Sequence, residues 1–304
     1  MHTILGAGGP IANALQKILI ENGKKVNLVS RRPISTVEDT TWHKADLTNY
    51  SEFLAAAKIS EVMYLCAGLI YDTQVWQQQW PVIINNAINV AKETGVRLIF
   101  FDNVYMYGRV NGPMLETTPY NPCSKKGEIR AKIAEQLMAE AKLGNIRASI
   151  ARAPDFYGAK TLNSFFDMMV LSKLAKKKSA QWLGNADALH SFILIEDAAK
   201  AVALLGENEQ SDNEIWHLPT SPALRGRQFI ELAAEAFDRK PNFAQINKFM
   251  LRCVGLFNPI VRNSIEMYYQ YQHDYQFNSD KFQSVFNAKP TPYREGFEML
   301  AKRY

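Results

Sequence analysis

Apolar residues fall in short continuous runs through the first half of the chain, and longer stretches with helical spacing lie between them. The runs predict strands at 3–5, 25–30, 61–66, 97–102 and 147–152. The amphipathic stretches predict helices at 10–22, 51–58, 80–94 and 126–143. Strands that are apolar throughout and alternate with helices are typical of a parallel sheet covered on both faces. Right-handed crossovers then give an α/β fold with a Rossmann-type doubly wound parallel sheet.

The pattern changes after residue 153. Two further strands are expected at 191–195 and 214–218, on either side of a helix at 196–206. The remaining predicted elements are helices rich in aromatic residues, at 227–237, 247–256, 260–272 and 292–303. We therefore expect a smaller, mostly helical C-terminal lobe that is interleaved with the first one. The predicted division is 1–158 plus 190–220 for the Rossmann lobe, and 159–189 plus 221–304 for a lobe that meets substrate or partner.

Composition and charge indicate which kinds of partner and compartment to expect for this chain. The 304 residues are 47% hydrophobic and 21% charged with a net charge of +5, which is ordinary for a globular chain. The basic run 173–178 is typical of a solvated helix end, so we expect no nucleic-acid partner. Cys66, Cys123 and Cys253 are widely spaced, which indicates a reducing cytoplasm, no disulfide framework and no metal site. No leader precedes the first strand and the apolar run 63–71 is too short to span a bilayer, so a cytoplasmic protein without a membrane partner is expected.

A glycine-rich turn joins the first predicted strand to the first predicted helix, in the stretch "TILGAGGPIANAL". Gly6 and Gly9 permit a tight turn and a close approach of a pyrophosphate to the backbone around Pro10 and Ile11. Ala12, three residues after Gly9, still lets helix and strand pack closely. A glycine-rich turn without a ligand is the alternative. The position at the first strand of a βαβ series favours dinucleotide binding.

The end of the second strand bears on the choice of dinucleotide. An NAD-specific fold would usually offer a carboxylate to the ribose hydroxyls there, and this chain has Arg31 and Arg32 after Ser30. Guanidinium groups suit a 2′-phosphate. Two solvated arginines in a loop are the alternative. We expect NADP(H) in preference to NAD.

Several motifs in this order resemble the short-chain dehydrogenase/reductase superfamily, in its extended or atypical branches of NAD-dependent epimerase/dehydratase type. The motifs are "GAGGPIA" (6–12), "ADLTN" (45–49), "LCAG" (65–68), "FFDNVYMYG" (100–108), "ARAPDFYG" (151–158) and "HSFILIEDAAKAV" (190–202). The resemblance covers nearly the whole chain. Beyond the glycine loop, it implies that the following residues border the cofactor: Asp46, Leu47, Cys66, Ala67, Gly68, Ala153 and Pro154.

The sequence departs from the family at the residues that carry its chemistry. The family serine or threonine falls on Asn103, and the family tyrosine and lysine fall on Lys126 and Arg130. None of the thirteen tyrosines has a lysine four residues later, so the family pair is absent and not displaced. This chain resembles atypical subgroups with an altered Ser-Tyr-Lys set, for which the resemblance implies a fold and a cofactor but no agreed reaction.

Residues four apart on a helix share a face, so Lys126 and Arg130 should point the same way. Lys126 is a candidate proton carrier or an anchor for an anionic ligand, and a lysine that reaches solvent is the alternative. Arg130 could hold ribose hydroxyls. Asn103 could orient a substrate oxygen, and Tyr105 could replace the missing acid. If the helix register is shifted by one residue, Lys125 would take the role proposed for Lys126.

Two functions remain open at this stage. The first is an NADP-dependent oxidoreductase or epimerase acting on a small molecule, which we expect to be anionic because two cations face its site. The second is a non-catalytic protein that senses NADP(H), which the missing tyrosine favours. The resemblance also implies a homodimer through the helices at 80–94 and 126–143. His190 and His217 are expected to be structural histidines with satisfied hydrogen bonds.

Overall fold

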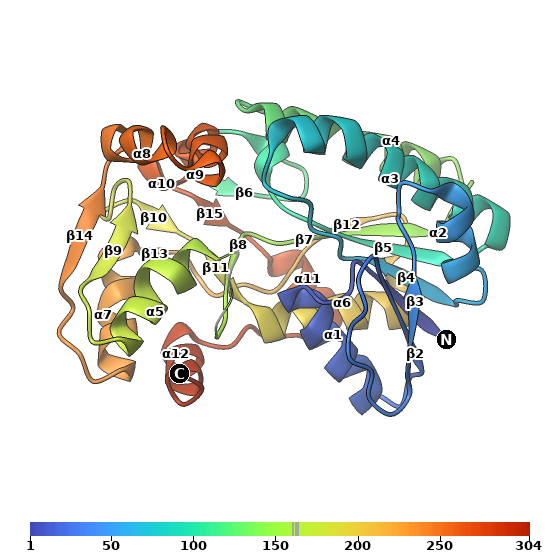
Figure 1. Ribbon diagram of the computed structural model, residues 1–304, viewed down its shortest axis with the longest axis horizontal. Helices are drawn as coiled ribbons and strands as arrows, with labels where there is room; N and C mark the ends of the chain where they lie inside the picture. Colours follow the sequence, from blue (N-terminus) through green and yellow to red (C-terminus); the bar gives the residue numbers. More distant parts are fainter. Residues whose placement is uncertain (160, 162–163) are drawn as a thin grey trace. The chain divides into compact units, whose positions relative to one another are not determined.

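The structure is a computed structural model that describes residues 1–159, 161 and 164–304 (Figure 1). These residues form two compact units. The sheet unit comprises 1–106, 126–153 and 198–218, and the second unit comprises 107–125, 154–197 and 219–304. The predicted Rossmann lobe had also included 107–125, 154–158, 190–197 and 219–220, which belong to the second unit.

A seven-stranded parallel sheet forms the centre of the sheet unit, in the order β12-β7-β5-β4-β1-β2-β3. The strands are β1 (His2–Leu5), β2 (Val26–Ser30), β3 (Thr40–Lys44), β4 (Val62–Leu65), β5 (Arg97–Asp102), β7 (Ala148–Arg152) and β12 (Ile215–His217). In the middle of the sheet, Ile4 pairs with Leu28 on one side and with Tyr64 on the other. The change of direction in strand order at β1 and β4 is the doubly wound arrangement, so the predicted fold class is confirmed.

Five helices accompany this sheet: α1 (Pro10–Glu21), α2 (Tyr50–Ala57), α3 (Thr73–Thr94), α4 (Lys125–Lys142) and α6 (Ile195–Glu207). Figure 1 shows α3 and α4 with α2 on one face of the sheet, and α1 with α6 on the other. The strands between them are buried on both faces, as in Ile4, Leu65 and Phe100, which have no exposed surface. Burial on both faces explains why these strands have continuous apolar runs.

Two elements of the sheet unit differ from the predictions. The strand β3 was missed, because it lies at the edge of the sheet and is only partly buried, with no continuous apolar run. Helix α3 begins at Thr73 and not at residue 80, because the Asp72 carboxylate caps it by accepting hydrogen bonds from the Gln74 and Val75 N–H groups. Pro81 therefore lies inside the helix.

The second unit contains short elements around an aromatic core. Its strands are β6 (Pro113–Met114), β8 (Asp155–Tyr157), β9 (Ala180–Leu183), β10 (Leu189–His190), β11 (Phe192–Leu194), β13 (Leu224–Arg225), β14 (Phe243–Ile246) and β15 (Gln276–Phe277). Its helices are a π-helical turn (Asp167–Leu171), α5 (Ser172–Ala175), α7 (Gly226–Ala236), α8 (Lys248–Gly255), α9 (Pro259–Ser264), α10 (Tyr269–Gln272), α11 (Asp280–Phe286) and α12 (Tyr293–Ala301). The strands pair two by two as β10-β13, β11-β8, β14-β9 and β15-β6.

Aromatic rings hold the second unit together. The ring centre of Phe166 lies between 4.9 and 6.3 Å from those of Trp182, Phe192, Phe229 and Phe297. The predicted helix at 260–272 is divided by a 3₁₀ turn at Ile265–Met267 into α9 and α10. Among the described residues of this unit, helical residues outnumber strand residues, and the unit also contains the four small strand pairs.

Candidate functional site

The loop between β1 and α1 requires glycine at its first position. Gly6 has φ +87°, and a Cβ there would lie 2.3 Å from the Ala67 Cα. A larger residue would therefore collide with the chain that follows β4 as well as strain its own backbone. The Gly6 and Ala7 N–H groups donate to the Val29 carbonyl, which fixes the turn against β2.

The same loop leaves the start of α1 open to an anion. Gly9 occupies the N-cap position in an extended conformation, no side chain caps the helix, and its first turn carries no acidic residue. A Cβ on Gly9 would have no neighbour nearer than the Gly6 carbonyl oxygen at 4.0 Å. Pro10 has no N–H to donate, so the nearest helical donor is the N–H of the buried Ile11. This arrangement fits a dinucleotide pyrophosphate, because a helix start with exposed N–H groups binds anions.

Arg31 and Arg32, after β2, are exposed. Arg31 lies close enough to Asp46 to contribute to the lowered pKa of that carboxyl group, although the hydrogen bond from the Thr48 N–H contributes more. The Asp46 carboxylate accepts from both the N–H and the hydroxyl of Thr48. Both arginines are thus exposed to solvent, and Arg31 lies near a carboxylate that already has local partners.

The other residues expected around the cofactor follow the strands of the sheet unit. Leu47 is buried, and its carbonyl accepts from the Asn86 side chain at 2.9 Å. Ala67 packs against Gly6, and Gly68 beside it is exposed. Burial raises the pKa of the Cys66 thiol to about 12, so this residue is a neutral thiol at neutral pH.

Ala153 follows β7 and is anchored to the neighbouring strand. It is buried, and its N–H donates to the Asp102 carbonyl at 3.0 Å. Pro154, the next residue, is buried and belongs to the second unit.

Lys126 and Arg130 share the buried face of α4, as their spacing predicts. Lys126 has no exposed surface, so the alternative of a lysine that reaches solvent is wrong. Its Nζ donates to the Thr73 hydroxyl at 2.9 Å and lies 4.5 Å from the centre of the Tyr71 ring. Lys125 is exposed, so the alternative helix register is also wrong.

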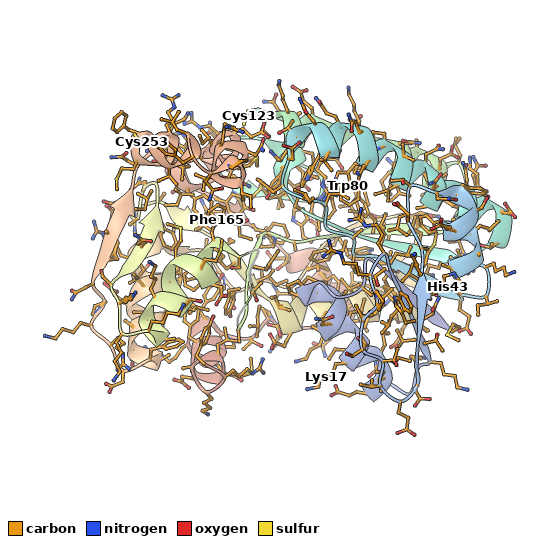
Figure 2. The ribbon with its side chains drawn as sticks, in the orientation of Figure 1. Lys17, His43, Trp80, Cys123, Phe165 and Cys253 are labelled. Atoms are coloured by element: carbon orange, nitrogen blue, oxygen red, sulfur yellow. The ribbon has the colours of Figure 1, made fainter. Side chains whose placement is uncertain are left out.

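Arg130 lies in an aromatic enclosure with an acid at one end. Its guanidinium carbon is 4.0 Å from the ring centre of Trp80 and 4.9 Å from that of Trp76. Its NH1 atom forms an ion pair with the buried Asp102 carboxylate at 3.2 Å. Burial lowers the pKa of the Arg130 guanidinium, and Asp102 opposes that shift. Figure 2 marks Trp80 on α3, the helix that supplies this enclosure.

Asp102 also forms an ion pair with an arginine of the neighbouring strand. Arg152 NH2 lies 3.5 Å from the other Asp102 oxygen, and both side chains have no exposed surface. One carboxylate at the end of β5 thus holds a guanidinium from α4 and one from β7. Charged groups are rarely buried without such pairing.

Asn103 and Tyr105 follow β5 at the same edge of the sheet. The Asn103 side-chain oxygen accepts from the Tyr105 N–H at 3.0 Å, which leaves its NH₂ group as the donor side of the amide. The Tyr105 ring stacks on Trp76, and its hydroxyl lies 3.4 Å from the Tyr71 hydroxyl. The structure therefore brings Tyr105 and Lys126 together around Tyr71, and Asn103 is joined to this group through the backbone of Tyr105.

Sequence reasoning missed five residues of this site: Tyr71, Thr73, Trp76, Trp80 and Asp102. Tyr71, Thr73 and Trp76 precede residue 80, where this helix was predicted to begin, and Trp80 is the first residue of that predicted helix. Their contacts with α4 cross about fifty residues of chain, which local spacing does not reveal. The available signal was Asp102 itself, a carboxylate at the end of an apolar strand, where ligands of doubly wound sheets bind.

A second polar cluster lies within the second unit. His190 Nε2 is 3.1 Å from an Asp155 oxygen, and the same oxygen accepts from the Tyr271 hydroxyl. The His190 ring stacks between Tyr271 and Tyr275. This confirms that His190 is a satisfied, buried histidine. His217 is also buried.

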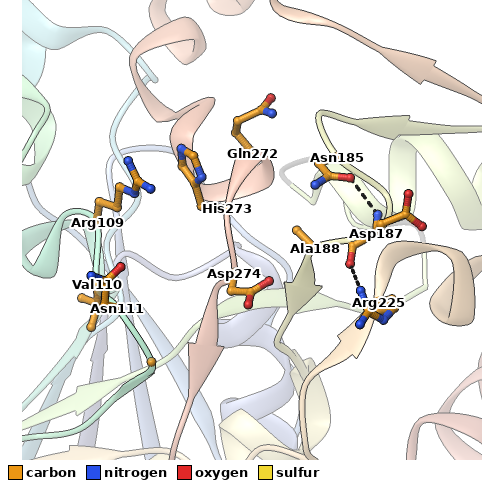
Figure 3. A pocket seen from close by; sticks show the side chains of 11 residues that line it. Arg109, Val110, Asn111, Asn185, Asp187, Ala188, Arg225, Gln272, His273 and Asp274 are labelled. Atoms are coloured by element: carbon orange, nitrogen blue, oxygen red, sulfur yellow. Dashed lines mark hydrogen bonds between the residues drawn. The ribbon is translucent and has the colours of Figure 1, made fainter.

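The second unit also has a polar cavity of about 500 Å³. Figure 3 shows Arg109 and His273 on one side of it and Arg225 on the other, with the Arg225 guanidinium donating to the Asp187 carbonyl. Asp274 also lines the cavity. Guanidinium, imidazole and carboxylate groups in one cavity suit a polar ligand better than an apolar one.

Metal-binding clusters and membrane-spanning helices are both absent from the residues that the structure describes. Within residues 1–159, 161 and 164–304, no three His, Cys, Asp or Glu side chains gather where they could hold a metal ion. Over the same residues, none of the helices combines the length and the apolar character needed to cross a bilayer.

Comparisons with known proteins find solved structures with a similar fold. Among solved structures, UDP-N-acetylglucosamine 4-epimerase from Bacillus cereus is 12% identical with a TM-score of 0.79, over 99% of this chain and 95% of that one. UDP-glucose 4-epimerase from Thermus thermophilus, solved with NAD, is 15% identical with a TM-score of 0.77, over 99% and 98%. MoeE5, solved with UDP-glucuronic acid and NAD, is 19% identical with a TM-score of 0.77, over 99% and 97%.

At these identities the structural likeness concerns the fold alone. A search of curated proteins finds no match. The sequence model of the NAD dependent epimerase/dehydratase family, however, matches residues 2–218, which include the glycine loop, all seven strands of the central sheet and the cluster around Lys126. The chain therefore belongs to the NAD dependent epimerase/dehydratase family.

Proposed function

We propose that the chain is an oxidoreductase or epimerase that depends on a nicotinamide dinucleotide, prefers NADP(H) to NAD, and acts on a small molecule with an anionic group. The observation that carries this proposal is the buried Lys126 ammonium, which donates to the Thr73 hydroxyl and lies over the ring of Tyr71. The Tyr71 hydroxyl in turn lies 3.4 Å from that of Tyr105. This cluster lies at the carboxyl edge of the sheet that also carries the Gly6 loop. Ligands of doubly wound sheets bind at that edge, near the change in strand order.

The side chains of the cluster suit three tasks. When bound, a nicotinamide supplies a donor or acceptor of hydride. Lys126 can donate a hydrogen bond to a substrate oxygen and stabilise negative charge on it, because its ammonium is held in a site without exposed surface. Asn103 can orient the same oxygen through its NH₂ group. Tyr105, whose hydroxyl faces that of Tyr71, is the candidate that exchanges the proton.

We assign Arg130 a positioning role. Its guanidinium is held by Asp102 and by the rings of Trp76 and Trp80, so it fixes the distance between α4 and α3 beside Lys126. The expectation that Arg130 holds ribose hydroxyls stays a prediction. An Arg130→Lys variant tests the positioning role, because it should raise KM and lower kcat together while dinucleotide affinity changes by less than about threefold.

The choice of NADP(H) rests on Arg31 and Arg32. Both are exposed after β2, where guanidinium groups suit the 2′-phosphate. Calorimetric titration should give at least about tenfold tighter binding of NADPH than of NADH, with the preference lost in an Arg31→Ala, Arg32→Ala variant. Lys17→Ala is the matched control, since Lys17 is an exposed cation on α1 that pairs with Glu21. Equal affinity for the two dinucleotides in the unaltered protein would overturn the preference.

The reaction is tested with a matched pair of nucleotide sugars. MoeE5 has been solved with UDP-glucuronic acid and with UDP-glucose, which differ by one carboxylate. We expect conversion of UDP-glucuronic acid, whose sugar carries a carboxylate, in preference to UDP-glucose, whose sugar is uncharged. Conversion is followed by chromatography of the products and by NADPH absorbance. Lys126→Met should abolish conversion and leave NADPH affinity within about threefold, since it keeps most of the length of the side chain and removes the charge. Conversion of UDP-glucuronic acid and UDP-glucose at equal rates, or an active Lys126→Met variant, would contradict the proposal.

A non-catalytic protein that senses NADP(H) is the second candidate. The observation in its favour is that a lysine and an arginine replace the family's tyrosine and lysine, and that Arg130 is tied to Asp102. Tight NADPH binding without conversion of any substrate, together with different proteolysis of the C-terminal segment with NADPH and NADP⁺, would support this candidate. By resemblance we also propose a homodimer through α3 and α4, which light scattering of the purified chain tests.

A further inference from the structure

The two short helices α8 and α9 form a hairpin with an unusually apolar exposed surface. On α8, Leu251 and Gly255 are the buried residues. The large apolar side chains that remain exposed on the hairpin, with their exposed fractions, are Phe249 (73%), Met250 (44%), Val254 (52%), Leu256 (72%), Phe257 (91%) and Ile260 (64%). Several exposed large apolar side chains on one element are typical of an interaction site.

The hairpin is a well-formed element, so its exposed residues are held in place. The Asn247 side chain caps α8 by accepting from the Met250 N–H, and Asn258 caps α9 by accepting from the N–H groups of Ile260 and Val261. Leu251 anchors α8 in a small core with Tyr268 and Tyr271. Because the caps and the anchor fix both helices, the exposed apolar face is a stable surface of the second unit.

Charge distinguishes this surface from an ordinary protein contact. From residue 239 to residue 265 the chain has five cations and no aspartate or glutamate. Lys248, Arg252 and Arg262 are exposed on the two helices that carry the apolar side chains. Short amphipathic helices with aromatic and aliphatic residues beside lysine and arginine are typical of elements that lie in the interface of an anionic bilayer.

We propose that the α8–α9 hairpin docks the protein on the surface of a membrane that contains anionic lipids. Phe257 and Leu256, at the turn between the helices, would enter the boundary between headgroups and acyl chains. Lys248, Arg252 and Arg262 would contact the lipid phosphates. The hairpin is too short to span a bilayer, so the association is peripheral. This proposal is independent of the proposed reaction, and it departs from the sequence-based expectation that no membrane partner exists.

Vesicle flotation of the full chain tests the proposal, with phosphatidylcholine vesicles compared with vesicles of phosphatidylcholine and phosphatidylglycerol. We expect binding to the anionic vesicles that is released by high salt. A Leu256→Ser, Phe257→Ser variant should lower the partition coefficient about 100-fold or more, because two apolar side chains lose their burial. A Lys248→Gln, Arg252→Gln variant should lower it about 30-fold, since each cation contributes about fivefold at an anionic surface.

Leu143→Ser is the matched control, because Leu143 is 74% exposed but lies in the sheet unit. This variant should bind the anionic vesicles as the unaltered protein does. Failure of the unaltered chain to float with anionic vesicles would overturn the proposal. So would a dimer in solution that the Leu256→Ser, Phe257→Ser variant converts to monomers without any change in vesicle binding, because a second copy would then be the occupant of the face.

Discussion

Replacement of Asp102 by asparagine should destabilise the sheet unit strongly. Asp102 ends β5 with no exposed side-chain surface, and its two oxygens lie 3.2 Å from Arg130 NH1 and 3.5 Å from Arg152 NH2. Asparagine keeps the shape and removes the negative charge, so two buried guanidinium groups lose the charge of this carboxylate. Removing one partner of a buried ion pair costs about 3–5 kcal/mol, and we expect a loss in this range.

The loss is measured by urea unfolding followed by far-UV circular dichroism. Asp187→Asn is the matched control, because Asp187 also pairs with an arginine, Arg227 at 2.6 Å, but both side chains are about half exposed. An exposed pair contributes about 1 kcal/mol or less, so the control should unfold close to the unaltered protein. Equal effects of the two substitutions would refute the electrostatic reasoning.

A second variant separates lost charge from lost shape. Arg130→Met places an uncharged, flexible side chain between Trp76 and Trp80, where a thioether packs well. If Asp102 acts by pairing with Arg130, the Asp102→Asn, Arg130→Met double variant should be more stable than the sum of the single losses by about 1–2 kcal/mol. Strict additivity of the two losses would show that the carboxylate and the guanidinium are not coupled.

Single residues of the sheet unit give three more predictions. Gly6→Ala should cost about 2–5 kcal/mol in urea unfolding because strain and collision add, whereas Gly23→Ala, at φ +72° with nothing within 4 Å of the new Cβ, should cost about 1–2 kcal/mol. Burial lowers the pKa of His2 from 6.5, so the unfolded state binds the proton more readily than the folded state. The stability of the fold should therefore fall as the pH drops below about 6.5, and His2→Gln should weaken that dependence. Cys66, with its pKa raised to about 12, should be alkylated at neutral pH at least about 100-fold more slowly than the exposed Cys123, and equal rates in the native state would contradict that pKa.

The fold could be predicted from the sequence wherever burial is complete. The strand 97–102 is correct to the residue, because both of its faces are covered and its apolar run is continuous. At the edge of the sheet only part of each side chain of β3 is buried, so Thr40–Lys44 carries a weak pattern. The start of α3 was missed for a different reason. It is marked by a capping aspartate and a run of glutamines, and neither produces the apolar spacing from which helices were predicted.

The candidate site could be predicted only in part. Helical spacing correctly gave Lys126 and Arg130 a common face, because that relation depends on local geometry alone. What surrounds the two cations depends on contacts between α3, α4 and β5, which are distant in the chain. Nothing in the local pattern around Trp80 indicates that its ring would face a guanidinium.

The surroundings of Lys126 and Arg130 argue for a remodelled site and against a decayed one. A site that had merely lost its chemistry would not need to bury two long cationic side chains, because burial of an ammonium or a guanidinium is costly unless partners offset it. Here Lys126 donates to the Thr73 hydroxyl and lies over the Tyr71 ring. Arg130 pairs with Asp102 and lies against two tryptophan rings. Each of these partners comes from a different position on α3, β5 or the segment before α3, so the enclosure depends on several residues that fit one another. Such an arrangement is costly to maintain for stability alone, since apolar side chains of similar volume would pack there at no electrostatic cost. We infer that the charge itself is what the site retains, and that the ligand of this edge of the sheet meets Lys126 as an anion or as an oxygen that becomes one.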